Sequence, residues 1–153
     1  GWHGDAAFTA PVGDVAPEVL RLIAVCDASL EAAIAVMVEG KRIGDIGHAV
    51  QSFAEEQRFS VVREYCGHGI GRIFHEDPQV LHYGEPHTGP ELRPGQTFTI
   101  EPMVNIGKRH VRLLADGWTV VTRDHSLSAQ WEHTILITDN GCEVLTLGAD
   151  EQR

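Results

Sequence analysis

Cysteine is scarce in this sequence and follows no recognisable spacing. The 153 residues contain three cysteines, Cys26, Cys66 and Cys142. An odd number of cysteines at unrelated spacings argues against a disulfide framework and against a CxxC metal-binding motif. It is consistent with a reducing compartment. A nucleophilic pair of Cys66 and His68 is an alternative, because residues two apart on an extended segment share a face. The sequence shows neither an oxyanion hole nor a third residue that would orient the histidine of that pair.

Basic residues are also few. The chain carries 12 Lys and Arg against 22 Asp and Glu, so its net charge is −10. This is the wrong sign for holding a phosphate backbone, and no local run of Lys or Arg compensates for it. The composition therefore argues against nucleic acid as a partner.

Long apolar runs are missing as well. No stretch approaches the roughly 18 apolar residues that cross a bilayer, and no basic region followed by an apolar segment opens the chain. We therefore expect a cytoplasmic protein without a membrane partner. The sequence starts without an initiator Met or a leading polar segment, and we interpret the chain as a fragment.

The sequence has enough apolar residues, 42%, for one core, and its length suits a single domain over residues 1–153. Helical spacing of apolar residues predicts a helix of about 20 residues from Pro17 towards Gly40. A second predicted helix runs from Gly44 or Asp45 to Phe59. Alternation and turn signals predict strands at 59–65, 97–104, 118–122 and 131–138, a loop from 78 to 94, and a final hairpin through 142–147. The expected fold class is α+β, with two helices against a mostly antiparallel sheet.

A glycine-rich segment from Glu64 to His82 carries two histidines, His68 and His75, seven residues apart. Three glycines, at positions 67, 69 and 71, surround the first histidine. Glycine in an apolar, strand-like segment suggests that something approaches the backbone closely, which is more typical of a site than of a core. The alternative is a glycine-rich turn in which the histidines only satisfy local hydrogen bonds.

Two glutamates, Glu101 and Glu132, lie in strands that should be buried. A buried carboxylate is costly unless a cation or a metal ion accompanies it, and no Lys or Arg occupies the inward positions of those strands. Together with Asp5 and His68 they make three carboxylates and one imidazole, a donor set for Mn, Fe, Co or Zn. The alternative is that both glutamates lie at the surface on sheet edges.

Five longer motifs extend over nearly the whole chain. They are HGD (3–5), VVREYCGHGIGRIFHEDPQVLHY (61–83), LRPGQTFTIEPM (92–103), DGWTV (116–120) and SLSAQWEHTILIT (126–138). In these motifs the chain closely resembles the type I methionine aminopeptidases. The resemblance implies a pita-bread fold, a pseudo-twofold antiparallel sheet flanked by helices, here without its N-terminal half. It also implies removal of the initiator methionine from newly made proteins.

The resemblance assigns roles to the candidate metal ligands. Asp5 and Glu132 would bridge two divalent ions (Co, Mn, Fe, Zn or Ni), while His68 and Glu101 would bind the first of them. Glu101 would also accept the proton of the attacking water. Members of the family carry a further metal-binding Asp and a second active-site His upstream, and this chain begins after both. We therefore expect at most one ion here.

The resemblance also assigns substrate contacts. His75 would hydrogen-bond the substrate peptide and stabilise the tetrahedral intermediate, and Phe74 and Trp118 would form part of the apolar methionine pocket. The implied partners are the N-termini of nascent polypeptides, which such enzymes can meet at the ribosome, and family members are usually monomeric. Ala6 stands where the family often has Thr, a change that removes one hydroxyl beside Asp5.

Two other functions fit the same residues. One is a catalytically inactive pita-bread domain that binds protein partners, although the presence of all four ligands argues against it. The other is an Xaa-Pro aminopeptidase, although the forms YCGHGIGRIFHEDP and SLSAQWEHT are more similar to the methionine enzymes.

Overall fold

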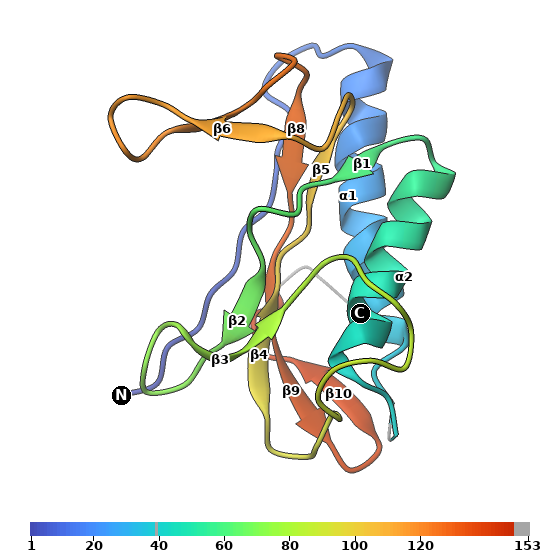
Figure 1. The fold of residues 1–153 in the computed structure, drawn as a ribbon, viewed down its shortest axis with the longest axis vertical. Coiled ribbons are helices and arrows are strands. Elements are labelled where there is room, and N and C mark those ends of the chain that lie inside the picture. Colours follow the sequence, from blue (N-terminus) through green and yellow to red (C-terminus); the bar gives the residue numbers. More distant parts are fainter. Residues whose placement is uncertain (39, 149–153) are drawn as a thin grey trace.

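The computed structural model describes residues 1–38 and 40–148, in which two helices stand beside a set of short strands (Figure 1). The helices are α1 (Pro17–Ala35) and α2 (Ile43–Glu56). The strands are β1 (Ser60–Val61), β2 (Gly67–Gly69), β3 (Glu76–Val80), β4 (Thr97–Ile100), β5 (Met103–Asn105), β6 (Val111–Leu113), β7 (Val120–Thr122), β8 (Ser128–Gln130), β9 (His133–Thr138) and β10 (Gly141–Val144). Helices that precede a run of antiparallel strands make an α+β fold, as the sequence predicts.

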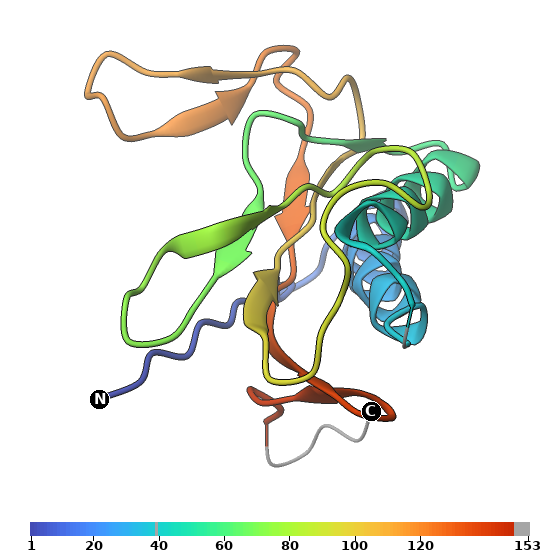
Figure 2. The same ribbon diagram turned by 60° about the horizontal axis from the view of Figure 1, so that its bottom comes forward.

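Both predicted helices are confirmed, with ends that differ by a few residues. Pro17 occupies the first turn of α1, where its missing N–H has no intrahelical role. The second helix starts at Ile43 because the N–H of Arg42 donates to Oδ2 of Asp45 at 2.8 Å and fixes the first turn. The two helices lie side by side and cover one side of the strands (Figures 1 and 2).

The core lies between this helix layer and the strands. Its fully buried side chains come from both layers, among them Leu22, Leu30, Ile46, Phe98 and Ile100. Apolar burial of this kind is the main favourable term in folding, and here it attaches the central strand β4 to the helices. No helix in the described ranges is long and apolar enough to cross a membrane.

The strands form two principal sheets. The larger has the order β10-β9-β4-β2-β3 and the smaller the order β1-β5-β8, with antiparallel pairing throughout. The chain passes from the larger sheet to the smaller between β4 and β5, at Glu101 and Pro102. It passes back between β8 and β9, at Trp131 and Glu132. Both predicted metal-binding glutamates therefore lie where the two sheets meet.

Several strand predictions need correction. The predicted strand at 97–104 is two strands, because Pro102 has no N–H and interrupts the ladder. The predicted strand at 59–65 is reduced to Ser60–Val61, and the strand predicted at 118–122 begins at Val120. The predicted loop from Pro78 is wrong at its start, since β3 continues to Val80. Proline is tolerated there because β3 is an edge strand, which needs no outward N–H bond.

Two segments have pairings that the sequence did not predict. Strands β6 and β7 form a separate antiparallel hairpin that projects from the sheets in Figure 2. The N-terminal segment runs extended and makes a single bridge between Ala7 and Glu132. That bridge joins the start of the described chain to a candidate ligand, Glu132, directly before β9.

Candidate metal centre

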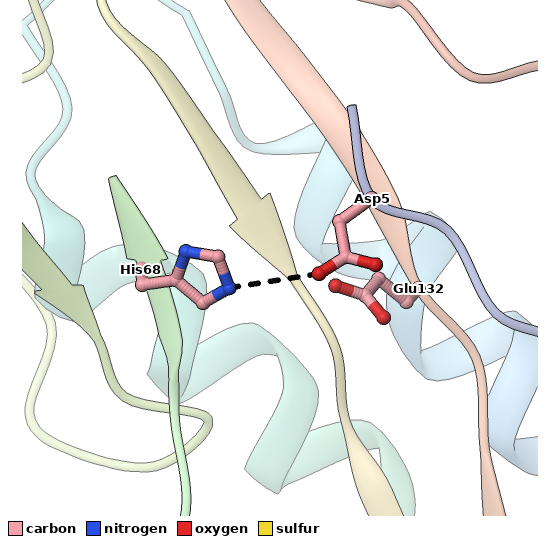
Figure 3. A group of neighbouring side chains, drawn as sticks. All are labelled: Asp5, His68 and Glu132. Atoms are coloured by element: carbon pink, nitrogen blue, oxygen red, sulfur yellow. Dashed lines mark ion pairs between the residues drawn. The ribbon is translucent and has the colours of Figure 1, made fainter. Parts of the chain in front are cut away.

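Three side chains from distant parts of the sequence meet at the junction of the sheets. Asp5, His68 and Glu132 each offer one ligand atom, and these atoms lie within 4.8 Å of one another. Figure 3 shows His68 reaching from β2 towards Asp5 on the N-terminal segment and Glu132 on the segment before β9. The Nε2 atom of His68 lies 3.8 Å from Oδ2 of Asp5. The structure thus brings together three of the four predicted ligands as one cluster.

The fourth predicted ligand, Glu101, borders this cluster. Its Oε1 lies 3.6 Å from Nε2 of His68. The hydroxyl of Thr99 donates to Oε1 at 2.9 Å, and Nε2 of Gln130 donates to Oε2 at 3.4 Å. The carboxylate is therefore held by both sheets, because Thr99 belongs to β4 and Gln130 to β8.

The local backbone fixes the orientation of His68. Its Nδ1–H donates to the carbonyl of Gly69 at 3.0 Å, which leaves the Nε2 lone pair directed at the carboxylates. A Cβ on Gly67 would collide with the carbonyl of Thr99, and a Cβ on Gly69 would collide with that of Asp77. The predicted close approach to these glycines is therefore made by the neighbouring strands β4 and β3.

Two carboxyl groups of this site, those of Glu101 and Glu132, have strongly raised pKa values. Burial raises the pKa of Glu132 to about 8, and the negative charges of Glu101 and Asp5 act in the same direction. Burial also raises the pKa of Glu101 to about 7, with a further increase from Asp5 that Thr99 and His75 partly oppose. Titratable groups with strongly shifted pKa values that lie close together are typical of functional sites.

The cluster fits a divalent metal ion. Oε1 of Glu132 is buried and has no hydrogen-bond partner among the described residues. A buried carboxylate oxygen without a partner, next to two more carboxylates and an imidazole lone pair, is what a divalent cation would satisfy. Asp5, His68, Glu101 and Glu132 are the residues that would hold it.

A cavity of about 530 Å³ opens beside the cluster. Its walls include Asp5, His68, Glu101 and His75. The His75 ring lies edge-on to the His68 ring, with centroids 4.2 Å apart, and Phe74 packs edge-on against His75 at 4.5 Å. The chain thus places an imidazole that is free of the ligand cluster at the wall of a cavity large enough for part of a peptide.

Comparison with known proteins identifies the family of this chain. Residues 1–139 match the model of Metallopeptidase family M24. The chain belongs to this family. It is 55% identical over 151 residues to a methionine aminopeptidase of Escherichia coli strain K12, in an alignment that covers 99% of this chain and 57% of that protein. It is 50% identical over 146 residues to methionine aminopeptidase 1 of Bacillus subtilis strain 168, covering 95% of this chain and 59% of that protein.

Solved structures agree with this assignment. The methionine aminopeptidase from Rickettsia prowazekii superposes with a TM-score of 0.94 at 51% identity, over 95% of this chain and 59% of that one. The prolidase from Pyrococcus furiosus gives a TM-score of 0.72 at 21% identity, a likeness of fold alone. The predicted resemblance and the α+β pita-bread class are confirmed. The M24 chain spans less than two thirds of the length of the curated relatives it matches.

One predicted substrate residue lies apart from the M24 site. Trp118 is on the loop between β6 and β7, its side chain is 87% exposed, and it does not line the cavity beside the metal cluster. The structure brings His75 and Phe74 to the cluster and leaves Trp118 outside it. Trp118 therefore stays a prediction that rests on the resemblance.

Three residues of this site were not predicted from the sequence. Thr99 and Gln130 hold Glu101, and each is two residues from a ligand in an extended segment, so the strand period places them on the ligand's face. The third is His82, whose Nε2 accepts a hydrogen bond from the backbone N–H of Glu101 at 3.0 Å. Burial lowers the pKa of His82 to about 3, so its ring is neutral at physiological pH. A histidine beside the apolar residues Val80 and Leu81 is the only signal that the sequence offers for this role.

Proposed function

We propose that this chain carries the catalytic centre of a methionine aminopeptidase, which uses a divalent metal ion to remove the N-terminal methionine of newly made proteins. The observation that supports this most directly is the convergence of Asp5, His68 and Glu132, with Glu101 beside His68 and a buried oxygen of Glu132 that has no hydrogen-bond partner among the described residues. The 55% identity to a methionine aminopeptidase indicates the substrate.

The proposed reaction is hydrolysis of the first peptide bond. A bound divalent ion supplies Lewis acidity, which polarises the scissile carbonyl and makes a water molecule a better nucleophile. Glu101 accepts a proton as the water oxygen attacks the carbonyl carbon, and it returns the proton to the leaving amine as the C–N bond breaks. Thr99 and Gln130 keep the carboxylate of Glu101 aimed at the reacting group.

His75 is proposed to act on the substrate and not on the metal. It lines the cavity, and its ring stands on the flank of His68 instead of among the ligand atoms. From this position it can donate a hydrogen bond to the peptide carbonyl and to the oxyanion that develops there.

Apolar surface next to this site suits a methionine side chain. Phe74 packs against His75, and a second cavity of about 450 Å³ shares Tyr65 and Met103 with the first. Valines form much of its remaining wall, at positions 62, 111, 120 and 121. We retain Trp118, two residues before Val120, as a proposed contributor to substrate binding.

The proposed substrates are nascent polypeptides in the cytoplasm, which the enzyme can meet at the ribosome. The described ligand set provides for one ion, chosen from Co, Mn, Fe, Zn and Ni. The solved X-Pro aminopeptidase of Thermotoga maritima is only 20% identical to this chain, so its likeness extends to fold alone. It lends no support to an Xaa-Pro substrate.

Two measurements test this function. Calorimetric titration of residues 1–153 with Mn²⁺ should give one ion per chain, and Glu132→Gln should abolish that binding. The natural protein that contains this sequence should hydrolyse Met-Ala-Ser and leave an Ala-Pro peptide intact. Hydrolysis of the Ala-Pro peptide alone would indicate the Xaa-Pro activity, and hydrolysis of neither would indicate an inactive binding domain.

A further inference from the structure

The backbone of Glu101 lies in a gap between two hydrogen-bonded ladders. The ladder of β4 with β9 ends at the pair Ile100 and His133, and the ladder of β5 with β8 begins at Met103 and Gln130. The N–H of Glu101 therefore has no strand partner, and Pro102 has no N–H to offer. The carbonyl of Pro102 accepts the N–H of Trp131 at 3.4 Å, but the partly buried N–H of Glu101 still needs a hydrogen-bond partner of its own.

That restraint comes from His82, which lies just after β3. Its Nε2 accepts the N–H of Glu101 at 3.0 Å. The His82 segment is itself held closely by α2, since a Cβ on Gly47 would lie 2.6 Å from the carbonyl oxygen of Tyr83 and displace it. His82 thus connects the helix layer to the backbone of Glu101.

The environment of Nδ1, the other ring nitrogen of His82, indicates the role of this residue. The ring is completely buried, and Nδ1 has no hydrogen-bond partner among the described residues. Because Nε2 is an acceptor, the neutral ring carries its proton on Nδ1, and a buried donor without a partner is unfavourable. An aliphatic side chain would avoid that cost, so the advantage of histidine here lies in the bond from Nε2 to Glu101.

We infer that His82 is a positioning residue that holds Glu101 in its metal-binding orientation. His82 fixes the backbone of Glu101, while Thr99 and Gln130 fix its carboxylate. The inference rests on the proposed metal centre, and it assigns to His82 the part that hydrogen-bonded neighbours commonly play around metal ligands.

Two variants of the whole chain separate positioning from packing. His82→Gln keeps a hydrogen-bond acceptor at about the same distance from the backbone as Nε2 of histidine. His82→Leu has a side chain of similar size without an acceptor. By calorimetry, His82→Leu should bind Mn²⁺ about tenfold more weakly than the wild type, and His82→Gln should stay close to it. Without metal, the amide of Glu101 should exchange hydrogen faster in His82→Leu than in the other two proteins. The thermal unfolding midpoint of the metal-free chain should change little, because one buried N–H lacks a partner both before and after the change to Leu.

Each outcome decides whether His82 has a positioning role. Equal Mn²⁺ affinity in the wild type and His82→Leu, or unchanged exchange at Glu101, overturns the inference and leaves the proposed function intact. Parallel loss of affinity and unfolding midpoint in both variants shows a packing role and also overturns it. If the wild type binds no Mn²⁺ at all, the proposed metal centre fails, and the inference fails with it.

Discussion

Asp5 and Thr134 are joined by a reciprocal pair of hydrogen bonds, although they lie 129 residues apart in the sequence. The backbone N–H of Asp5 donates to Oγ1 of Thr134 at 2.9 Å, and the same hydroxyl donates to the carbonyl of Asp5 at 2.8 Å. Two residues on, the carbonyl of Ala7 accepts the N–H of Glu132 at 2.7 Å. The N-terminal segment is thereby attached to β9 and to Glu132 just before it, which holds the backbones of Asp5 and Glu132 together.

Replacing Thr134 by Val should loosen this attachment. The change keeps the shape of the side chain but leaves an N–H and a carbonyl of Asp5 without partners, at a cost of about 1–3 kcal/mol in unfolding free energy. Affinity for Mn²⁺ should fall as well, because Asp5 loses its anchor. Urea denaturation and calorimetry measure the two effects, and Thr134→Ser, which keeps the hydroxyl, is the control. Unchanged Mn²⁺ affinity in Thr134→Val would show that Asp5 does not need this bond.

Glu101→Gln should reduce the catalytic rate of the natural protein by orders of magnitude. The amide keeps a similar shape but can neither accept the proton of the attacking water nor provide a charged ligand. Steady-state hydrolysis of Met-Ala-Ser measures the effect. A rate within about tenfold of the wild type, a barrier change of only about 1.4 kcal/mol, would remove Glu101 from the mechanism.

His75→Ala should lower the rate of hydrolysis while metal affinity stays near that of the wild type. The reason is its position, which is on the cavity wall and outside the group of ligand atoms. Calorimetry with Mn²⁺ and kinetics with Met-Ala-Ser should be run on the same preparation. Loss of metal from His75→Ala would contradict the assignment, and His68→Ala provides the comparison in which metal binding should fail.

The metal-free chain should become less stable as the pH rises from about 5 to about 8. The pKa of Glu101 is raised to about 7 and that of Glu132 to about 8, from an ordinary value of 4.5. In this range the folded chain holds protons that the unfolded chain has released, so a rise in pH favours unfolding. The stability present at low pH is lost as the pH passes through the folded values. One pKa unit corresponds to about 1.4 kcal/mol, so a difference of roughly a few kcal/mol is expected.

Urea denaturation in the presence of a chelator at several pH values measures this dependence. Glu132→Gln removes one of the two groups, and its stability should vary less with pH over the same range. A wild-type chain that gains stability between about pH 5 and pH 8 would show that the two carboxyl groups are already ionised when folded.

Local patterns in the sequence predicted much of this site. The expected burial of Glu101 in the segment 97–104 led to its prediction as a ligand, and in the structure its Oε1 lies 3.6 Å from Nε2 of His68. The cost of burying Glu132 predicted an unusual environment, and the structure leaves one of its oxygens without a partner among the described residues. These inferences succeed because strand period and burial are properties of short segments.

Other features depend on contacts between distant segments, so local sequence patterns could not predict them. The glycines beside His68 are required by the carbonyls of β3 and β4, which no local pattern identifies. Pro78 has no backbone N–H and therefore predicts a loop. Because β3 is an edge strand, the proline is nevertheless tolerated within it. The bond from Glu101 to His82 spans 19 residues and exists only because the sheet ladder has a gap there.

The two chain crossings between the sheets, at 101–102 and 131–132, have a mechanical consequence. Each crossing carries one of the candidate ligand carboxylates, Glu101 or Glu132, so an ion held there would act as a clasp between the two sheets, in addition to the backbone that connects them. Sliding of one sheet against the other would stretch the coordination, and coordination would in turn oppose the sliding. At a free ion concentration one hundred times the dissociation constant, such a clasp would add about 2.7 kcal/mol to the stability of the whole chain.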